Sequence, residues 1–198
     1  MLETKALACE RGGRRLFSDL GFALGAGELL RVRGANGSGK TSLLRILAGL
    51  TRPETGTIAW RGKARDWDFG REMLFLGHAP ALKDELSVLE NFAFSCQLSF
   101  LKEEKNALER LGVGRLADLP ARFLSQGQRR RVALARLGVA SSMPLWLLDE
   151  PFAALDEEAI VAVRGLIEGH LAGGGLVVLT SHQEFPLAAR AERALALG

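Results

Sequence analysis

Eight consecutive residues of the chain have the types and spacing needed to hold a phosphate group. They read Gly34-Ala35-Asn36-Gly37-Ser38-Gly39-Lys40-Thr41 and fit the pattern G-x-x-x-x-G-K-[ST] without a gap. Glycines in such a loop let backbone N–H groups close around phosphate oxygens at a helix N-terminus, where the helix dipole is positive. Lys40 would add a full charge on the β- and γ-phosphates, and the Thr41 hydroxyl would ligate Mg²⁺. We therefore expect a nucleotide-binding loop whose contacts continue to Ser42.

Two carboxylates follow a second apolar segment, Leu145 to Leu148. Asp149, at the tip of the expected strand, can hold Mg²⁺ through its water shell, whereas Glu150 reaches further and can polarise an attacking water. The alternative is a helix cap after a core strand. The hydrolytic interpretation is favoured because Pro151 and Ala154-Leu155-Asp156 follow the pair.

Short apolar segments, several of them followed by helical patterns, must position these residues. The helical spacing of Ser42 to Leu50 supplies the helix after the phosphate loop, and Glu28 to Val32 supplies the strand before it. This alternation predicts an α/β fold with a parallel sheet covered on both faces and with phosphate chemistry at the strand C-termini. The expected strands are Leu2 to Cys9, Phe17 to Leu24, Glu28 to Val32, Thr57 to Trp60, Met73 to Leu76, Leu145 to Leu148, Leu176 to Thr180 and Ala194 to Leu197.

Between Lys83 and about Ser141 the pattern is helical only. Ser87 and Glu90 form a capping box that opens one of these helices. We expect a single domain over residues 1–198, with an α/β core at about 1–82 and 142–198 and an inserted helical subdomain at about 83–141.

The composition of the chain sets few further limits. With 198 residues, 47% of them apolar, the chain can bury a substantial core. There is no run of 18 apolar residues and no signal-peptide pattern, so we expect no membrane-spanning segment. The net charge of +3 comes from 26 basic and 23 acidic residues spread along the chain, and it requires no nucleic-acid partner. Cys9 and Cys96 are expected to be reduced thiols without a chemical role.

The segment Leu124-Ser125-Gln126-Gly127-Gln128 resembles the signature motif of ATP-binding cassette (ABC) ATPases. Ser125 would cap a helix whose N-terminus faces an anion. The resemblance implies a P-loop NTPase fold with a RecA-like core, and a head-to-tail homodimer that holds two ATP molecules. Each ATP would lie between one phosphate loop and Ser125, Gly127 and Gln128 of the other subunit. The following run, Arg129 to Arg131, is expected to be a solvated helix face rather than a membrane or partner contact.

The same resemblance assigns two more positions. His182, after the expected strand Leu176 to Thr180, matches the histidine that contacts the γ-phosphate and holds the attacking water. Asp156 matches the aspartate that crosses the dimer interface. Lys40, Glu150 and His182 are then the catalytic residues, with ATP and Mg²⁺ as ligands.

Two positions depart from the usual cassette. His78 stands where most cassettes have a glutamine that senses Mg²⁺ and touches the membrane partner, and an imidazole titrates near neutral pH whereas an amide does not. The aromatic residue that stacks on adenine is also missing. Arg11 lies at that place, and its guanidinium plane could stack on the base instead.

The stretches around these departures, CER…RRLFSDLGFALGAGELLRVRG and FLGHAPALKDELSVLENF, resemble the ATP-binding subunits of bacterial cytochrome c maturation systems. The resemblance implies a peripheral subunit on the cytoplasmic face of the inner membrane, paired with CcmB and working with CcmC, CcmD and the haem chaperone CcmE. ATP hydrolysis would drive haem export or release of the haem-loaded chaperone. The partner surface is expected near His78 and the stretch Asn91 to Leu101, for whose aromatic residues a helical core is the alternative.

Other functions remain open on the sequence alone. They are the ATPase subunit of another small exporter, a soluble cassette of iron–sulfur assembly, and a nucleotide-gated binding module without turnover. The last is disfavoured because both Glu150 and His182 are present. A translation-factor cassette is disfavoured because there is one phosphate loop where such proteins usually carry two.

Overall fold

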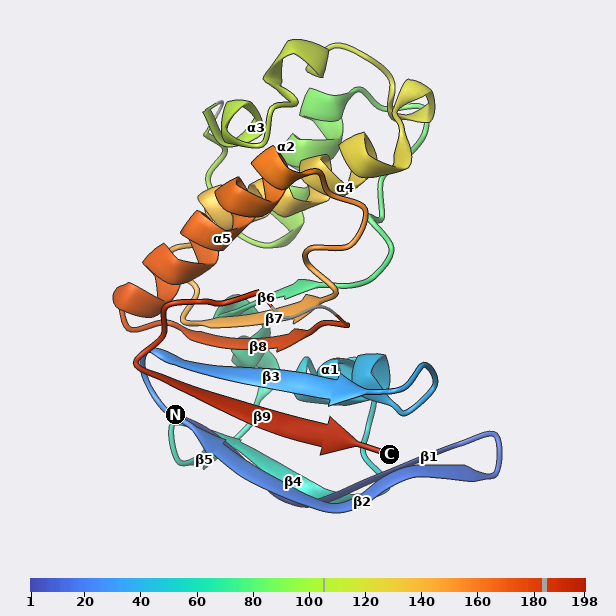
Figure 1. Cartoon of the computed structure of the whole chain (residues 1–198), viewed down its shortest axis with the longest axis vertical. Coiled ribbons are helices and arrows are strands. Elements are labelled where there is room, and N and C mark those ends of the chain that lie inside the picture. The colour runs from blue at the N-terminus through green and yellow to red at the C-terminus, as the bar shows by residue number, and fades with distance from the viewer. Residues whose placement is uncertain (105, 183–184) are drawn as a thin grey trace.

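The computed structural model describes residues 1–104, 106–182 and 185–198. Its central layer is a five-stranded sheet with the order β6-β7-β8-β3-β9, in which all neighbouring strands are parallel (Figure 1). The strands are β3 (Glu28–Gly34), β6 (Met73–Leu76), β7 (Leu145–Asp149), β8 (Leu176–Thr180) and β9 (Ala191–Leu197). The predicted α/β class with a parallel sheet is therefore confirmed.

A second sheet lies at one end of the molecule and is antiparallel, with the order β2-β1-β4-β5 (Figure 1). Its strands are β1 (Leu2–Arg11), β2 (Arg14–Leu24), β4 (Thr55–Trp60) and β5 (Lys63–Ala64). The sequence indicated three of these strands but neither β5 nor a separate sheet. Gly12 and Gly13 have φ angles of 57° and 74°, as the tight turn that folds β2 back on β1 requires.

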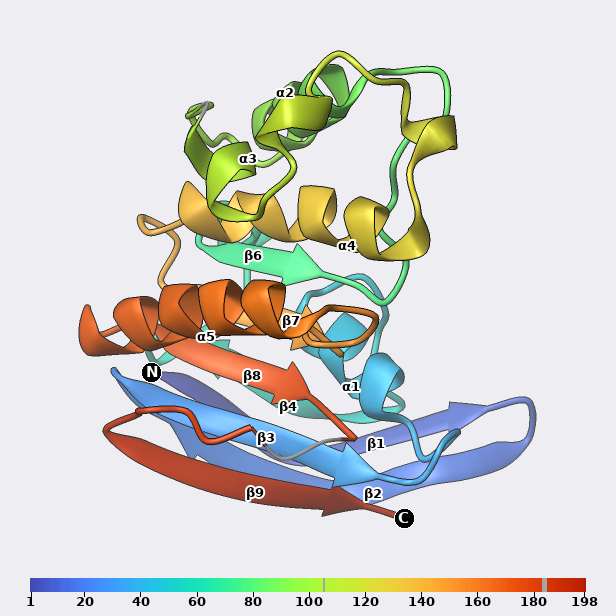
Figure 2. The same ribbon diagram turned by 45° about the horizontal axis from the view of Figure 1, so that its top comes forward.

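Helix α1 (Lys40–Leu47) lies between the two sheets, whereas α5 (Glu157–Ala172) and the helices between β6 and β7 pack on the opposite face of the parallel sheet (Figure 2). Helix α1 begins two residues earlier than the expected Ser42 and ends before Leu50. It ends because Gly49, at φ 77°, turns the chain so that its N–H reaches the carbonyl of Ile46.

The strands of the parallel sheet contribute to both faces in alternation. Trp146 and Leu148 of β7 pack towards α5 and the helical segment, while Leu145 and Leu147 pack towards α1 and the antiparallel sheet. All residues of β7 and β8 are buried, as expected for a parallel sheet covered on both sides.

The segment between β6 and β7 contains only helices where the structure describes it. They are α2 (Val88–Leu98), α3 (Asn106–Arg110), α4 (Gln126–Leu134) and the 3₁₀ helices η2 (Gly114–Leu116), η3 (Ala121–Phe123) and η4 (Ala135–Gly138), while η1 (Trp67–Arg71) precedes β6. The predicted capping box at Ser87 is present, and a second one joins Ser125 to Gln128 at the start of α4. Among the described helices, none is long and apolar enough to cross a membrane.

Candidate nucleotide site

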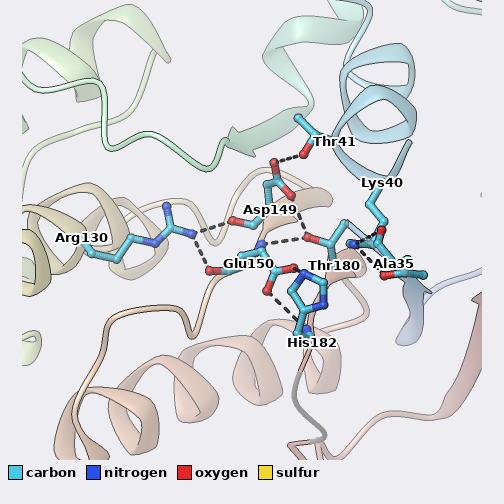
Figure 3. Close-up of polar contacts among 9 residues, drawn as sticks. Ala35, Lys40, Thr41, Arg130, Asp149, Glu150, Thr180 and His182 are labelled. Carbon is cyan, nitrogen blue, oxygen red and sulfur yellow. Dashed lines mark hydrogen bonds and ion pairs between the residues drawn. The ribbon is translucent and has the colours of Figure 1, made fainter. Parts of the chain in front are cut away.

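The phosphate loop joins the end of β3 to the start of α1, which is the predicted strand-loop-helix context. Gly34, at φ 150°, leaves no room for a side chain, because a Cβ there would lie 2.4 Å from the carbonyl oxygen of Leu197. The first turn of α1 carries no acidic residue that would offset its positive end. The Lys40 ammonium donates hydrogen bonds to the carbonyls of Gly34 (2.7 Å) and Ala35 (3.0 Å), so its charge is held inside the loop (Figure 3).

A cavity of about 740 Å³ opens beside the loop, within the range of small-molecule sites. Residues from six separate segments meet there, including both positions at which the sequence departs from the usual cassette. The lining residues are Arg11, Leu16, Asn36, Gly37, Gly39, Lys40, Thr41, Ser42, His78, Asp149, Glu150, Ala153 and His182. Most residues predicted for one chain's share of the nucleotide site thus line one cavity, whereas Gly34, Ala35 and Ser38 of the phosphate loop do not line it.

Asp149 is 1% exposed and both of its carboxylate oxygens accept hydrogen bonds. Thr41 donates to Oδ2 at 2.8 Å, and Thr180 donates to Oδ1 at 2.7 Å. Hydroxyl and carboxylate oxygens are ligands that Mg²⁺ prefers, usually with one or two carboxylates and the phosphates of the nucleotide, so Thr41 and Asp149 fit this ion. Sequence reasoning missed Thr180, whose only signal was a polar residue at the end of the strand next to β7.

Glu150 is held in an uncommon backbone conformation, with φ 52° in the left-handed region. Its N–H donates to the Thr180 hydroxyl at 2.9 Å. Its carboxylate lies beside His182, with Oε1 3.3 Å from the imidazole Nε2 and Oε2 accepting a hydrogen bond from the His182 N–H at 3.4 Å (Figure 3). The predicted base and the predicted switch histidine are therefore neighbours at the cavity.

The signature residues lie elsewhere. Ser125, Gly127, Gln128 and Asp156 line a second cavity of about 470 Å³, which shares no lining residue with the first. Asp156 caps α5 by accepting a hydrogen bond from the Ala159 N–H. One chain therefore carries two halves of the expected site on separate surfaces.

The expectation of a solvated face for Arg129 to Arg131 is wrong. Arg130 is 5% exposed, and the side chains of Arg129 and Arg131 pair with Asp84 and Asp156. Three successive residues of a helix point in different directions. Arg130 lies four residues before Leu134, so it shares a helix face with that core residue and faces inward. A run of like charges in the sequence does not show which of the three arginines is buried.

The stretch Asn91 to Leu101 divides between core and surface. Asn91, Phe92, Cys96 and Leu101 are buried, and burial raises the pKa of the Cys96 thiol to about 11. Phe94, Leu98 and Phe100 are 41%, 66% and 70% exposed. Core packing thus accounts for only part of the stretch, and three apolar side chains face outward.

Residues 17–153 match the sequence pattern of the ABC transporter family. This range includes the phosphate loop, the signature segment and both carboxylates. The chain belongs to the ABC transporter family. As a member of this family it is an ATP-binding ATPase. Three of the predicted site residues, Arg11, Asp156 and His182, lie outside the matched range.

Particular members of the family are similar over nearly the whole chain. The cytochrome c biogenesis ATP-binding export protein CcmA of Dechloromonas aromatica is 49% identical over 205 residues, covering 100% of both chains. An ABC transporter ATP-binding protein from Pyrococcus furiosus has a TM-score of 0.82 and 28% identity over 98% of this chain and 96% of its own. A dimeric cassette bound to ADP and Pi has a TM-score of 0.78 and 25% identity over 92% and 88%. The resemblance to the cytochrome c maturation subunits is confirmed.

Proposed function

We propose that this chain is the ATP-hydrolysing subunit of an ABC-type export complex in c-type cytochrome biogenesis. The observation that carries the proposal is the 49% identity to a CcmA protein over the full length of both chains. ATP hydrolysis would be coupled to haem export or to release of a haem-loaded chaperone. Residues 1–198 form one nucleotide-binding domain, with the core at about 1–82 and 142–198 and the helical subdomain at about 83–141.

The residues of the large cavity have distinct roles in this proposal. Backbone N–H groups of the loop and the Lys40 ammonium bind the β- and γ-phosphates. Thr41 and Asp149 hold Mg²⁺, which when bound neutralises charge on the phosphates. Glu150 accepts a hydrogen bond from the attacking water and draws off its proton, and His182 holds that water against the γ-phosphate. Arg11 lies where adenine would stack.

The separation of the two cavities supports a head-to-tail homodimer. The N-terminus of α4, with Ser125, Gly127 and Gln128, would close on the γ-phosphate of an ATP held by the other subunit, and Asp156 would cross the interface. The similar cassette solved with ADP and Pi is itself dimeric. Each hydrolytic site would then need both chains.

The complex would include a membrane permease. We assign this role to CcmB, with CcmC, CcmD and CcmE as further partners and a peripheral position on the cytoplasmic face of the inner membrane. The exposed Phe94, Leu98 and Phe100 supply apolar surface for such a contact. His78, which lies between the sheet and the helical segment, would link that contact to the nucleotide.

Two variants test the ATPase. Lys40→Ala should lose both nucleotide affinity and turnover, whereas Glu150→Gln should keep ATP binding and lose hydrolysis, because only Glu150 polarises water. Gel filtration of the Glu150→Gln protein with Mg-ATP should show an ATP-bound dimer. Wild-type turnover by Glu150→Gln would contradict the mechanism, and normal c-type cytochromes in cells that lack this gene would contradict the haem-pathway role alone.

A further inference from the structure

Arg130 connects the helical segment to the catalytic strands through backbone carbonyls. It lies five residues after Ser125, which caps α4, and its guanidinium donates to four carbonyl oxygens. Nη1 donates to Gly77 (2.8 Å) and His78 (3.2 Å), and Nη2 donates to Asp149 (2.6 Å) and Glu150 (2.7 Å). One planar side chain thus spans the ends of the neighbouring parallel strands β6 and β7, and Figure 3 shows its bonds to Asp149 and Glu150 on the β7 side.

Burial removes the charged guanidinium of Arg130 from water, which is unfavourable, and the hydrogen bonds to the four carbonyls must offset that desolvation. Arg130 is 5% exposed, and desolvation lowers its pKa, while the charges of Asp149 and Glu150 act in the opposite direction. A guanidinium is the side chain suited to this place, because its fixed fork presents parallel N–H pairs to two groups at once. A lysine ammonium is a compact point charge and cannot reproduce that span.

The bond to Glu150 matters because of how that residue is held. Its left-handed backbone is strained for a residue with a Cβ, so surrounding contacts must maintain it. The Thr180 hydroxyl accepts from its N–H, and Arg130 donates to its carbonyl oxygen, so both backbone polar groups are fixed. In this conformation the carboxylate oxygen Oε1 lies 3.3 Å from the His182 imidazole Nε2.

We propose that Arg130 is a positioning residue that aligns Glu150 for hydrolysis and links this alignment to the orientation of the signature helix, which is α4 with its cap Ser125. Because Arg130 and Ser125 belong to the same short helix segment, a rotation of that helix moves the guanidinium with it. The carbonyls of His78 and Glu150 are then displaced together. The ends of β6 and β7 therefore shift when α4 changes its position relative to the nucleotide that it contacts.

Arg130→Lys tests the proposal, with Arg129→Lys as the matched control on the same helix, since Arg129 pairs with Asp84 at the surface. Arg130→Lys should lower kcat at least about tenfold while the KM for ATP stays within about threefold, because only alignment is lost. Thermal melts set an assay temperature at which both variants are folded. If Arg130→Lys does not fold, the same measurements apply to Arg130→Gln.

A double-mutant cycle distinguishes positioning from general support. Adding Arg130→Lys to Glu150→Gln should change the residual single-turnover rate by less than about twofold, because the group it aligns is already gone. An equal fold-loss in both backgrounds, or a kcat equal to that of Arg129→Lys, would overturn the inference. The inference rests on the proposed ATPase function, and inactive wild-type protein would refute that function instead.

Discussion

Replacing Thr180 by valine isolates a hydroxyl that serves two residues of the catalytic cavity. Thr180 is fully buried, and its oxygen donates to Asp149 at 2.7 Å and accepts from the Glu150 N–H at 2.9 Å. Valine has nearly the same shape, so the change removes hydrogen bonds rather than volume. The hydrogen bond to a charged group contributes about 1.5–3 kcal/mol, and an unsatisfied buried N–H costs about 1–3 kcal/mol.

We expect Thr180→Val to lower the free energy of unfolding by about 3 kcal/mol, which corresponds to a melting temperature about 6–12 °C lower for a domain of this size. Urea unfolding followed by circular dichroism measures the loss. Thr180→Ser is the control, because it keeps the hydroxyl and loses one methyl group, worth about 0.8 kcal/mol. If valine and serine differ by less than about 0.5 kcal/mol, the hydroxyl does not support the carboxylates as described.

Three further predictions concern other parts of the molecule. Burial lowers the pKa of His170 to about 4, below its unfolded value of 6.5, so the unfolded chain binds more protons between these pH values and the free energy of unfolding should fall as pH drops through this window. Urea unfolding at pH 7 and pH 5 should show this loss, up to about 3 kcal/mol at complete protonation, and His170→Phe should remove it; equal pH dependence in both proteins would refute the assignment. Ser125→Arg should abolish hydrolysis but keep nucleotide binding, and mixing it with Lys40→Ala subunits should restore part of the ATPase rate; loss of ATP binding by Ser125→Arg alone would argue against a signature that acts on the other subunit. His78→Ala should keep ATP affinity within about threefold yet lower the c-type cytochrome content of cells that depend on this protein, and unchanged cytochrome content would count against a coupling role.

The local parts of the fold could be predicted because their signals lie in adjacent residues. The phosphate loop, the strand before it and the capping box at Ser87 each depend on a few consecutive positions. Helix α1 was misplaced by two to three residues, since its ends depend on the conformations of Gly39 and Gly49. The antiparallel sheet was not expected, because strand signals do not say which strands pair.

The supporting contacts of the site could not be predicted. Thr180 reaches Asp149 across 31 positions of the chain, and Arg130 reaches His78 across 52. Neither residue belongs to a motif that names its partner, and the charge pattern around Arg130 indicated the surface. Residue types identified the groups that could react with nucleotide, whereas the groups that hold them in place became visible only when helix and strand ends were brought together.

The alternation of side chains along β7 has a consequence for how the protein can vary. Leu147 and Leu148 are neighbours in sequence and both fully buried, yet one packs on the side of α1 and the other on the side of α5. Substitutions at odd positions of this strand must be accommodated by the nucleotide-binding side, and those at even positions by the side that carries the helices. Changes of side-chain volume at alternate residues of this one strand therefore act on different packing layers of the domain.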